Sequence, residues 1–106
     1  MIRTDMSCVN LSGANLSNAN LEFAILDAAN LTKGNLRDAV LDCTYLIGSN
    51  LTNANLNDAY LNSVTLDGAN LTGANLTGAY LTASLKKTIF CNTIMPDGSI
   101  RNDHCC

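Results

Sequence analysis

The sequence is poor in the residues that most binding and catalytic sites require. It has no tryptophan and one proline, and charged side chains make up 14% of its 106 residues. The formal net charge of −3 is spread along the chain, with no cluster of Lys and Arg. Because contact with a phosphate backbone needs concentrated positive charge, we expect no direct binding of nucleic acid. Polar residues also interrupt every apolar stretch well before the length of about 18 residues that a membrane-spanning helix needs.

Groups for catalysis or metal binding are equally scarce. The single histidine, His104, lies in the tail beside Cys105 and Cys106, without the paired Cys-x-x-Cys spacing that is typical of a metal site. Asp38 and Asp58 resemble a carboxylate pair, but charged residues on a repeating surface usually form a solvated face. We therefore expect a protein that is not an enzyme and that holds no cofactor and no metal.

What the sequence does contain is a repeat of five residues. An apolar residue recurs at every fifth position without a gap, and a small residue usually lies two positions before it. The series comprises Met6, Leu11, Leu16, Leu21, Leu26, Leu31, Leu36, Leu41, Leu46, Leu51, Leu56, Leu61, Leu66, Leu71, Leu76 and Leu81. From Leu11 onwards these residues are predicted to form the core, and the repeating unit reads Ala-Asn-Leu-x-x.

A period of five fits neither common secondary structure. On an α-helix each successive leucine would be rotated by about 140°, and on a strand an odd spacing would alternate between the two faces. A chain that turns a corner in every unit does place all the leucines in one interior. Turn-forming residues such as Gly13, Asn53 and Gly68 lie where these corners would fall. The repeat therefore predicts an all-β fold, the coils of a β-helix.

The residue before each leucine indicates how many sides a coil has. Most of these residues are Asn, and the exceptions are Ile25, Val40, Tyr45, Tyr60, Thr65 and Tyr80. A period of fifteen mixes Asn with the exceptions in every column. A period of twenty separates them, because the series from Asn10 to Asn70 and from Asn15 to Asn75 then contain only Asn. This favours four-sided coils, although the pattern leaves the exact corners open. Four coils at the usual strand spacing would rise about 19 Å.

These units resemble the pentapeptide repeat family, whose tandem A(D/N)LXX repeats are similar to residues 4–83. The resemblance implies a right-handed quadrilateral β-helix of about four coils, with no shared catalytic residues. Some members of the family inhibit DNA gyrase by imitating duplex DNA. Others are small secreted or lumenal proteins of cyanobacteria and plants. The tail from Phe90 to Gly98 looks like the closing segment of the small cyanobacterial type.

We divide the chain into an N-terminal tail (1–3), the β-helix (4–83) and a C-terminal cap (84–106). The solenoid is expected to end after Leu81, because Lys86 occupies the next position due to a leucine. The turn Pro96-Asp97-Gly98 lies between apolar pairs and predicts a small hairpin or loop folded over the last coil.

The cysteines suggest how the cap is held. Cys91 precedes the predicted turn and Cys105 and Cys106 follow it, so a disulfide from Cys91 to either of them would close the cap. Cys8 and Cys43 should lie about two coils apart and are expected to be free thiols. A structural disulfide would indicate a periplasm or thylakoid lumen, whereas without it we expect a cytoplasmic protein. Residues 1 to 6 lack the features of a secretory signal.

Two columns that depart from Asn form the predicted interaction face. We expect it to bind an unknown protein partner from a rigid surface, the protein being a monomer or a weak end-to-end oligomer. Its residues are Ile25, Val40, Tyr45, Ile47, Tyr60 and Tyr80. Self-stacking that merely stabilises the coils is an equal alternative. Two further alternatives are a purely structural or stress-related extracytoplasmic role and DNA mimicry against a topoisomerase. The acidic residues available for mimicry are Glu22, Asp27, Asp38, Asp42, Asp58 and Asp67, on a chain that looks too short.

Overall fold

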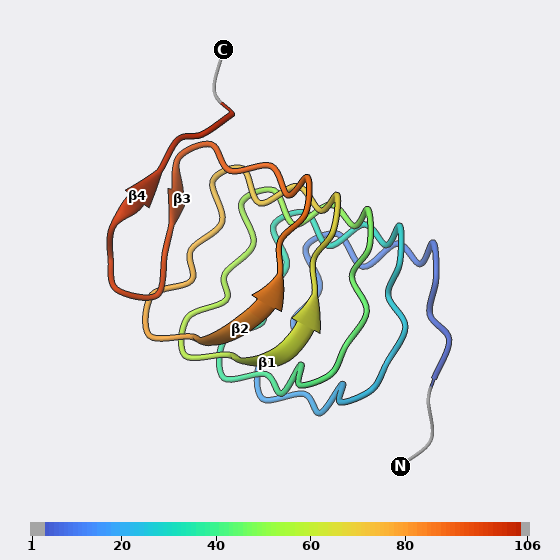
Figure 1. The fold of residues 1–106 in the computed structure, drawn as a ribbon. Helices are drawn as coiled ribbons and strands as arrows, with labels where there is room; N and C mark the ends of the chain where they lie inside the picture. Colours follow the sequence, from blue (N-terminus) through green and yellow to red (C-terminus); the bar gives the residue numbers. More distant parts are fainter. Residues whose placement is uncertain (1–3, 105–106) are drawn as a thin grey trace.

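The computed structural model describes residues 4–104, which wind into a four-sided β-helix (Figure 1). Residues twenty positions apart pair as parallel β-bridges on successive coils, for example Asn10 with Asn30 and Asn30 with Asn50. The molecule measures 38 × 24 × 23 Å, and its two shorter dimensions are nearly equal, as expected for a square section. The predicted period of twenty and the all-β fold class are therefore confirmed.

Each corner is a four-residue turn built by one repeat unit. The N–H of the small residue donates to the carbonyl of the leucine three positions earlier, as from Ala14 to Leu11 at 3.0 Å and from Ala54 to Leu51 at 3.0 Å. The residue just before the small one has a positive φ, which is 69° at Gly13 and 59° at Lys33. Between residues 4 and 104, twelve residues other than glycine adopt this left-handed conformation, at a cost of about 1–2 kcal/mol each. The corners are thus strained locally and are held in place by the coils around them.

Backbone hydrogen bonds between coils supply part of that support. The N–H of Leu31 donates upward to the carbonyl of Asn50 at 2.8 Å, and the N–H of Asn50 donates back to Ala29 at 2.9 Å. The same pair of bonds recurs on each side of the solenoid, so the backbone polar groups along the sides are satisfied by neighbouring coils.

The leucine series fills the interior. Every member from Leu26 to Leu76 is at most 1% exposed, and Leu31 lies beneath Leu51 with both buried. Burial of a leucine side chain stabilises the folded state by about 1.5–3 kcal/mol. Towards the ends, Leu11, Leu16 and Leu81 are only partly buried. The core is therefore continuous in the middle and open at its margins.

Four polar residues occupy the small interior position without leaving their hydroxyl groups unpaired. The hydroxyl of Thr44 donates to the carbonyl of Leu21 at 3.0 Å, and that of Ser49 donates to Leu46 at 2.8 Å. Thr88 and Thr93, both almost fully buried, make equivalent bonds to the backbone of the coil beneath. A hydroxyl is tolerated here because a backbone carbonyl is within reach.

One side of the solenoid contains regular strands with an irregularity between them. Strand β1 (Tyr60–Thr65) pairs in parallel with strand β2 (Tyr80–Ser84). Asn62 lies opposite Thr82 and Val64 opposite Ala83, so Ser63 has no counterpart in β2. This β-bulge makes the last coil one residue shorter than the others. Beyond it the paired residues are nineteen apart, as in the bridge between Asn70 and Ile89.

The bulge corrects our expectation that the solenoid ends after residue 83. Because the register shifts by one, Leu85 takes the interior position that we assigned to Lys86, which is exposed. Phe90 follows five residues later at 1% exposure, and Met95 packs partly against the core. The coil therefore continues for three more sides. The deletion hides the repeat from any search at a fixed spacing.

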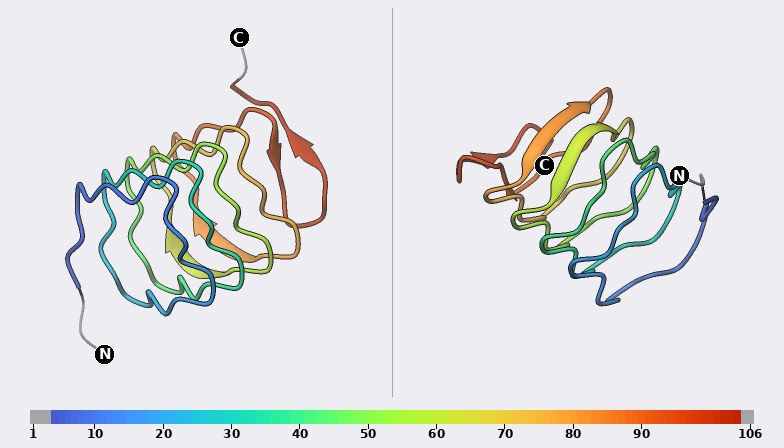
Figure 2. Two further views of the ribbon diagram at one scale, coloured as in Figure 1. Left: turned by 180° about the vertical axis from the view of Figure 1, so that it is seen from behind. Right: turned by 90° about the horizontal axis from the view of Figure 1, so that it is seen from below.

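The hairpin predicted around Pro96 is confirmed. Strand β3 (Thr93–Ile94) pairs antiparallel with strand β4 (Ile100–Arg101), which lies at the C-terminal end of the solenoid (Figures 1 and 2). In the turn, the hydroxyl and N–H of Ser99 donate to the Asp97 carboxylate at 2.6 and 3.0 Å. These bonds stabilise the charged form and lower the pKa of Asp97 below its ordinary value of 3.8, the hydroxyl having the larger effect.

Contacts with Phe90 fasten β4 and the segment after it to the last coil. The guanidinium of Arg101 lies over the Phe90 ring, 3.9 Å from its centroid, and pairs with Asp103 at 2.7 Å. The backbone N–H of His104 donates to the carbonyl of Phe90 at 2.9 Å. The ring Nδ1 of His104 accepts the backbone N–H of Phe90 at 3.1 Å. Phe90 is therefore the anchor of the cap.

The cysteines divide into two groups. Cys8 and Cys43 are free, as expected. Cys91 is half-buried in the last coil, whereas Cys105 and Cys106 lie outside the described residues, so the cap disulfide stays a prediction. The predicted N-terminal tail (1–3) also lies outside the described residues.

Candidate interaction face

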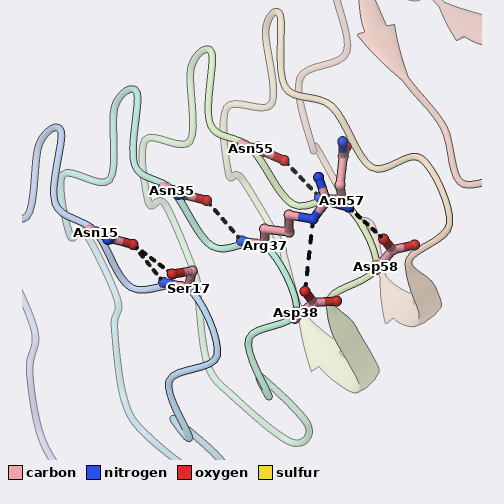
Figure 3. Close-up of polar contacts among 8 residues, drawn as sticks. All are labelled: Asn15, Ser17, Asn35, Arg37, Asp38, Asn55, Asn57 and Asp58. Atoms are coloured by element: carbon pink, nitrogen blue, oxygen red, sulfur yellow. Dashed lines mark hydrogen bonds and ion pairs between the residues drawn. The ribbon is translucent and has the colours of Figure 1, made fainter.

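Two of the four sides carry Asn ladders with a defined structural task. The side-chain oxygen of each Asn before a leucine accepts the backbone N–H two residues further on, as in Asn15 to Ser17 at 3.1 Å and Asn55 to Asn57 at 3.0 Å (Figure 3). The bond satisfies a donor that the corner would otherwise expose. These sides are therefore explained by the requirements of the coil.

At three positions where the Asn is missing, an aspartate of the coil beneath takes over. Asp27 accepts the N–H of Ile47 at 2.9 Å, and Asp42 accepts the N–H of Asn62 at 2.9 Å. Asp67 accepts the N–H of Lys86 at 3.2 Å. The sequence signal was visible, because each aspartate lies two positions after a residue that replaces Asn. We had grouped these carboxylates with the acidic surface and missed this role.

The replaced positions create an exposed aromatic column. Tyr60 opens β1 and Tyr80 opens β2, and their rings stack with centroids 5.0 Å apart and planes 8° from parallel. They are 41% and 56% exposed. Val40 pairs with Tyr60 on the coil beneath and is half-buried. We call Val40, Tyr60 and Tyr80 the tyrosine column.

The remaining predicted residues lie on the adjoining side. Ile25 pairs with Tyr45, and both are half-buried. Ile47, 44% exposed, follows two positions after Tyr45 at the next corner. The structure thus separates the six residues into two groups, one side of the coil apart. The tyrosine column presents the larger exposed aromatic area.

Two carboxylates beside the tyrosine column share one cation. Arg37 reaches Asp38 and Asp58 on consecutive coils, at 3.8 Å in both cases (Figure 3). All three side chains are about half exposed, so each pair contributes no more than about 1 kcal/mol. The carboxylates that we compared with a catalytic pair are therefore neighbours of a shared cation.

Two exposed isoleucines were missed as surface features. Ile89, 36% exposed, lies above the Asn70 ladder, and Ile100, 64% exposed, lies in β4. We had placed both among the apolar pairs of the cap. Their exposure depends on the register shift and on the direction of the hairpin, neither of which the residue types alone specify.

The described residues contain no group of three His, Cys, Asp or Glu side chains able to hold a metal ion. His104 uses Nδ1 to bind the N–H of Phe90. Between residues 4 and 104 no helix is long and apolar enough to cross a membrane.

The twenty-residue square coil with interior leucines defines a class of solenoid, the quadrilateral β-helix. The pentapeptide repeat model, in its form with eight copies, matches residues 4–42 and 39–78. The chain belongs to the pentapeptide repeat family, whose members fold as right-handed quadrilateral β-helices.

Two solved structures support this assignment. A pentapeptide repeat protein of the Arabidopsis thaliana thylakoid lumen is 29% identical, with a TM-score of 0.85 over 94% of this chain and 70% of its own. Rfr23 of the cyanobacterium Cyanothece 51142 is 42% identical, with a TM-score of 0.77 over 81% of this chain and 60% of its own. The chain thus spans about two thirds of the length of these structures. No curated protein sequence matches it.

Proposed function

We propose that this pentapeptide repeat protein is a non-enzymatic interaction module that binds a partner protein through the tyrosine column. One observation carries the proposal: Tyr60 and Tyr80 stay stacked while a large part of each ring remains exposed. Tyrosine is enriched among the residues that dominate the energy of protein interfaces. A pre-ordered pair also loses little side-chain entropy on binding.

The family assignment supports this choice, because pentapeptide repeat proteins are generally structural or interaction modules. The competing interpretation, that the rings only stabilise the coil, explains the stack but not why aromatic residues replace Asn. An Asn at these positions would satisfy the corner by itself, as it does at Asn55. The replacement therefore favours a role beyond stability.

The test compares capture of native partners by three forms of the protein. The double variant Tyr60→Asn with Tyr80→Asn restores the majority repeat residue and removes the aromatic column. The matched control, Ile89→Asn with Ile100→Asn, removes exposed apolar surface elsewhere. We expect the first variant to lose a partner, identified by mass spectrometry, that wild type and control both retain. Equal capture by all three would refute the proposal.

The acidic residues give the DNA-mimic alternative less support. Asp27, Asp42 and Asp67 accept backbone hydrogen bonds, and Asp38 and Asp58 share Arg37. Most of these carboxylates thus already have a partner on the surface of the same chain. We expect no inhibition of gyrase at micromolar protein in a supercoiling assay.

For location we propose an oxidising extracytoplasmic compartment, such as a thylakoid lumen or periplasm. The relative from the Arabidopsis thylakoid lumen supports this, as does the position of Cys91 in the cap. The proposal depends on the cap disulfide, and the cysteine labelling described in the Discussion tests it.

A further inference from the structure

The cap covers only part of the C-terminal end of the solenoid. Strand β4 lies beside β3, and the segment after it bonds back to the same side through Phe90 and Asn92. Strand β2 has β1 as its sole sheet neighbour within residues 4–104. In Figure 1 the β3–β4 hairpin lies along a different side of the last coil from β2. One side of the last coil therefore ends in an uncovered strand edge.

Lower coils show which backbone groups this edge presents. The N–H of Leu41 donates to the carbonyl of Tyr60 above it at 2.7 Å, and the carbonyl of Ala39 accepts the N–H of Tyr60 at 2.9 Å. The equivalent groups on the last coil are the N–H of Leu81 and the carbonyl of Ala79. They point away from β1, towards the uncovered end. Such a donor and acceptor form a template for an added parallel strand.

The side chains along the edge restrict what that strand can be. Tyr80 stacks on Tyr60 with one ring face, which leaves its other face directed towards the open end. Leu81 is half-buried, whereas Leu61 on the coil beneath is 1% exposed. An aromatic residue above Tyr80 and an aliphatic residue above Leu81 would extend both ladders. The neighbouring β3–β4 cap blocks a whole coil, so a single strand fits where the end of a second solenoid does not.

We propose that the β2 edge binds an extended segment of a partner protein as an added parallel strand, whose aromatic-aliphatic dipeptide lies on Tyr80 and Leu81. This inference rests on the proposed function and identifies the part of the partner that the tyrosine column recognises. The tyrosine column would thereby bind one aromatic side chain of the partner's strand in a fixed register.

A peptide copied from the chain itself is a suitable probe, because β1 pairs in parallel with the opposite edge of β2 and places Tyr60 and Leu61 against Tyr80 and Leu81. We would titrate a synthetic peptide of residues 58–66 into ¹⁵N-labelled protein and follow backbone amides by NMR. The expected result is saturable shifts confined to Tyr80–Ser84, with slower hydrogen exchange at Leu81. The amide of Leu61, which β2 already covers, is the internal control.

Two matched changes test recognition of the dipeptide. A peptide carrying Tyr60→Asn and Leu61→Asn should not bind detectably. Protein carrying Tyr80→Asn should bind the original peptide about threefold to tenfold more weakly, as expected for the loss of one aromatic pair. Its unchanged spectrum away from β2 would show that the coil is intact.

Three outcomes would overturn the proposal. These are the absence of saturable shifts, shifts that map to the N-terminal coil, and protection of Leu81 in free protein that disappears on dilution. The last would assign the edge to a second copy of the chain. Partner capture that still depends on Tyr60 and Tyr80 while the peptide leaves β2 unaffected would remove the strand site and preserve the proposed function.

Discussion

The rings of Tyr60 and Tyr80 lie 5.0 Å apart and within 8° of parallel, close to the spacing of the strands that carry them. The stack is thus a consequence of parallel pairing in register. Aromatic pairs contribute about 0.5–1.5 kcal/mol beyond the area they bury.

A double-mutant cycle should detect that coupling. We expect Tyr60→Asn and Tyr80→Asn to show a coupling energy of about 0.5–1.5 kcal/mol in urea denaturation. Additive effects of the two substitutions would mean that the rings are not stacked in solution. Circular dichroism of each variant is the check that the β-helix is retained.

The aspartate beneath a missing Asn should be replaceable by that Asn. Asp42→Ala removes the acceptor of the Asn62 N–H and should cost about 0.5–1.5 kcal/mol. In a Tyr60→Asn background the cost should nearly vanish, because an Asn at position 60 would accept the same N–H, as Asn50 does from Thr52. Asp38→Asn is the control, since it removes only a half-exposed ion pair and keeps a side chain that tolerates the φ of 59°. If Asp42→Ala cost the same in both backgrounds, an Asn at position 60 would not replace Asp42 as the acceptor of the Asn62 N–H.

Removing a glycine from a corner and introducing one at another corner should change the stability of the fold in opposite directions. Gly48 has a φ of 66° and open space around it, so Gly48→Ala should lower the free energy of unfolding by about 1 kcal/mol through backbone strain alone. Lys33 is exposed and has a φ of 59°, so Lys33→Gly should raise the free energy of unfolding by up to about 1 kcal/mol. Thermal melts of the two variants give the signs, and equal signs would show that the positive φ is not a source of strain at these corners.

The register shift makes a prediction about neighbouring residues in the last coil. Phe90→Ala should cost about 3–5 kcal/mol, because it empties an interior position under Arg101. Ile89→Ala, one residue earlier, should cost less than about 1 kcal/mol because the side chain faces outward. Urea denaturation measures both losses, and a larger loss of unfolding free energy for Ile89→Ala than for Phe90→Ala would contradict the register shift.

The predictable part of this fold is the part where one residue type repeats for one physical reason. Leucines inside and Asn acceptors at the corners encode the coil directly, so the period of twenty could be inferred from residues such as Asn30 and Asn50. The continuation past Thr82 could not, because a single residue missing from β2 opposite Ser63 moves every later side chain by one position. Phe90 and Thr88 then serve in place of leucine and alanine, which a search for the consensus does not detect.

The tyrosine column was found as a departure from the repeat, and its geometry followed from the register. The uncovered β2 edge could not be inferred in the same way. It depends on which side of the last coil the β3–β4 hairpin covers, and this is decided by contacts of Arg101 and His104 with Phe90. Such contacts connect segments that no periodic pattern relates.

Cysteine labelling should decide whether the cap is closed covalently. The chain has five cysteines, and one disulfide between Cys91 and either Cys105 or Cys106 would leave five minus two, or three, thiols open to alkylation in denaturant. We therefore expect three adducts without reductant and five with it, measured by intact mass. Peptide mapping should find Cys8 and Cys43 labelled in both samples, since both are free. Five adducts in protein isolated under conditions that prevent reduction would remove the disulfide, and with it the main argument for an oxidising compartment. Closing a loop of about 15 residues stabilises a fold by about 3 kcal/mol in the chain-entropy model, so reductant should also lower the melting temperature of wild type but not of a Cys91→Ser variant.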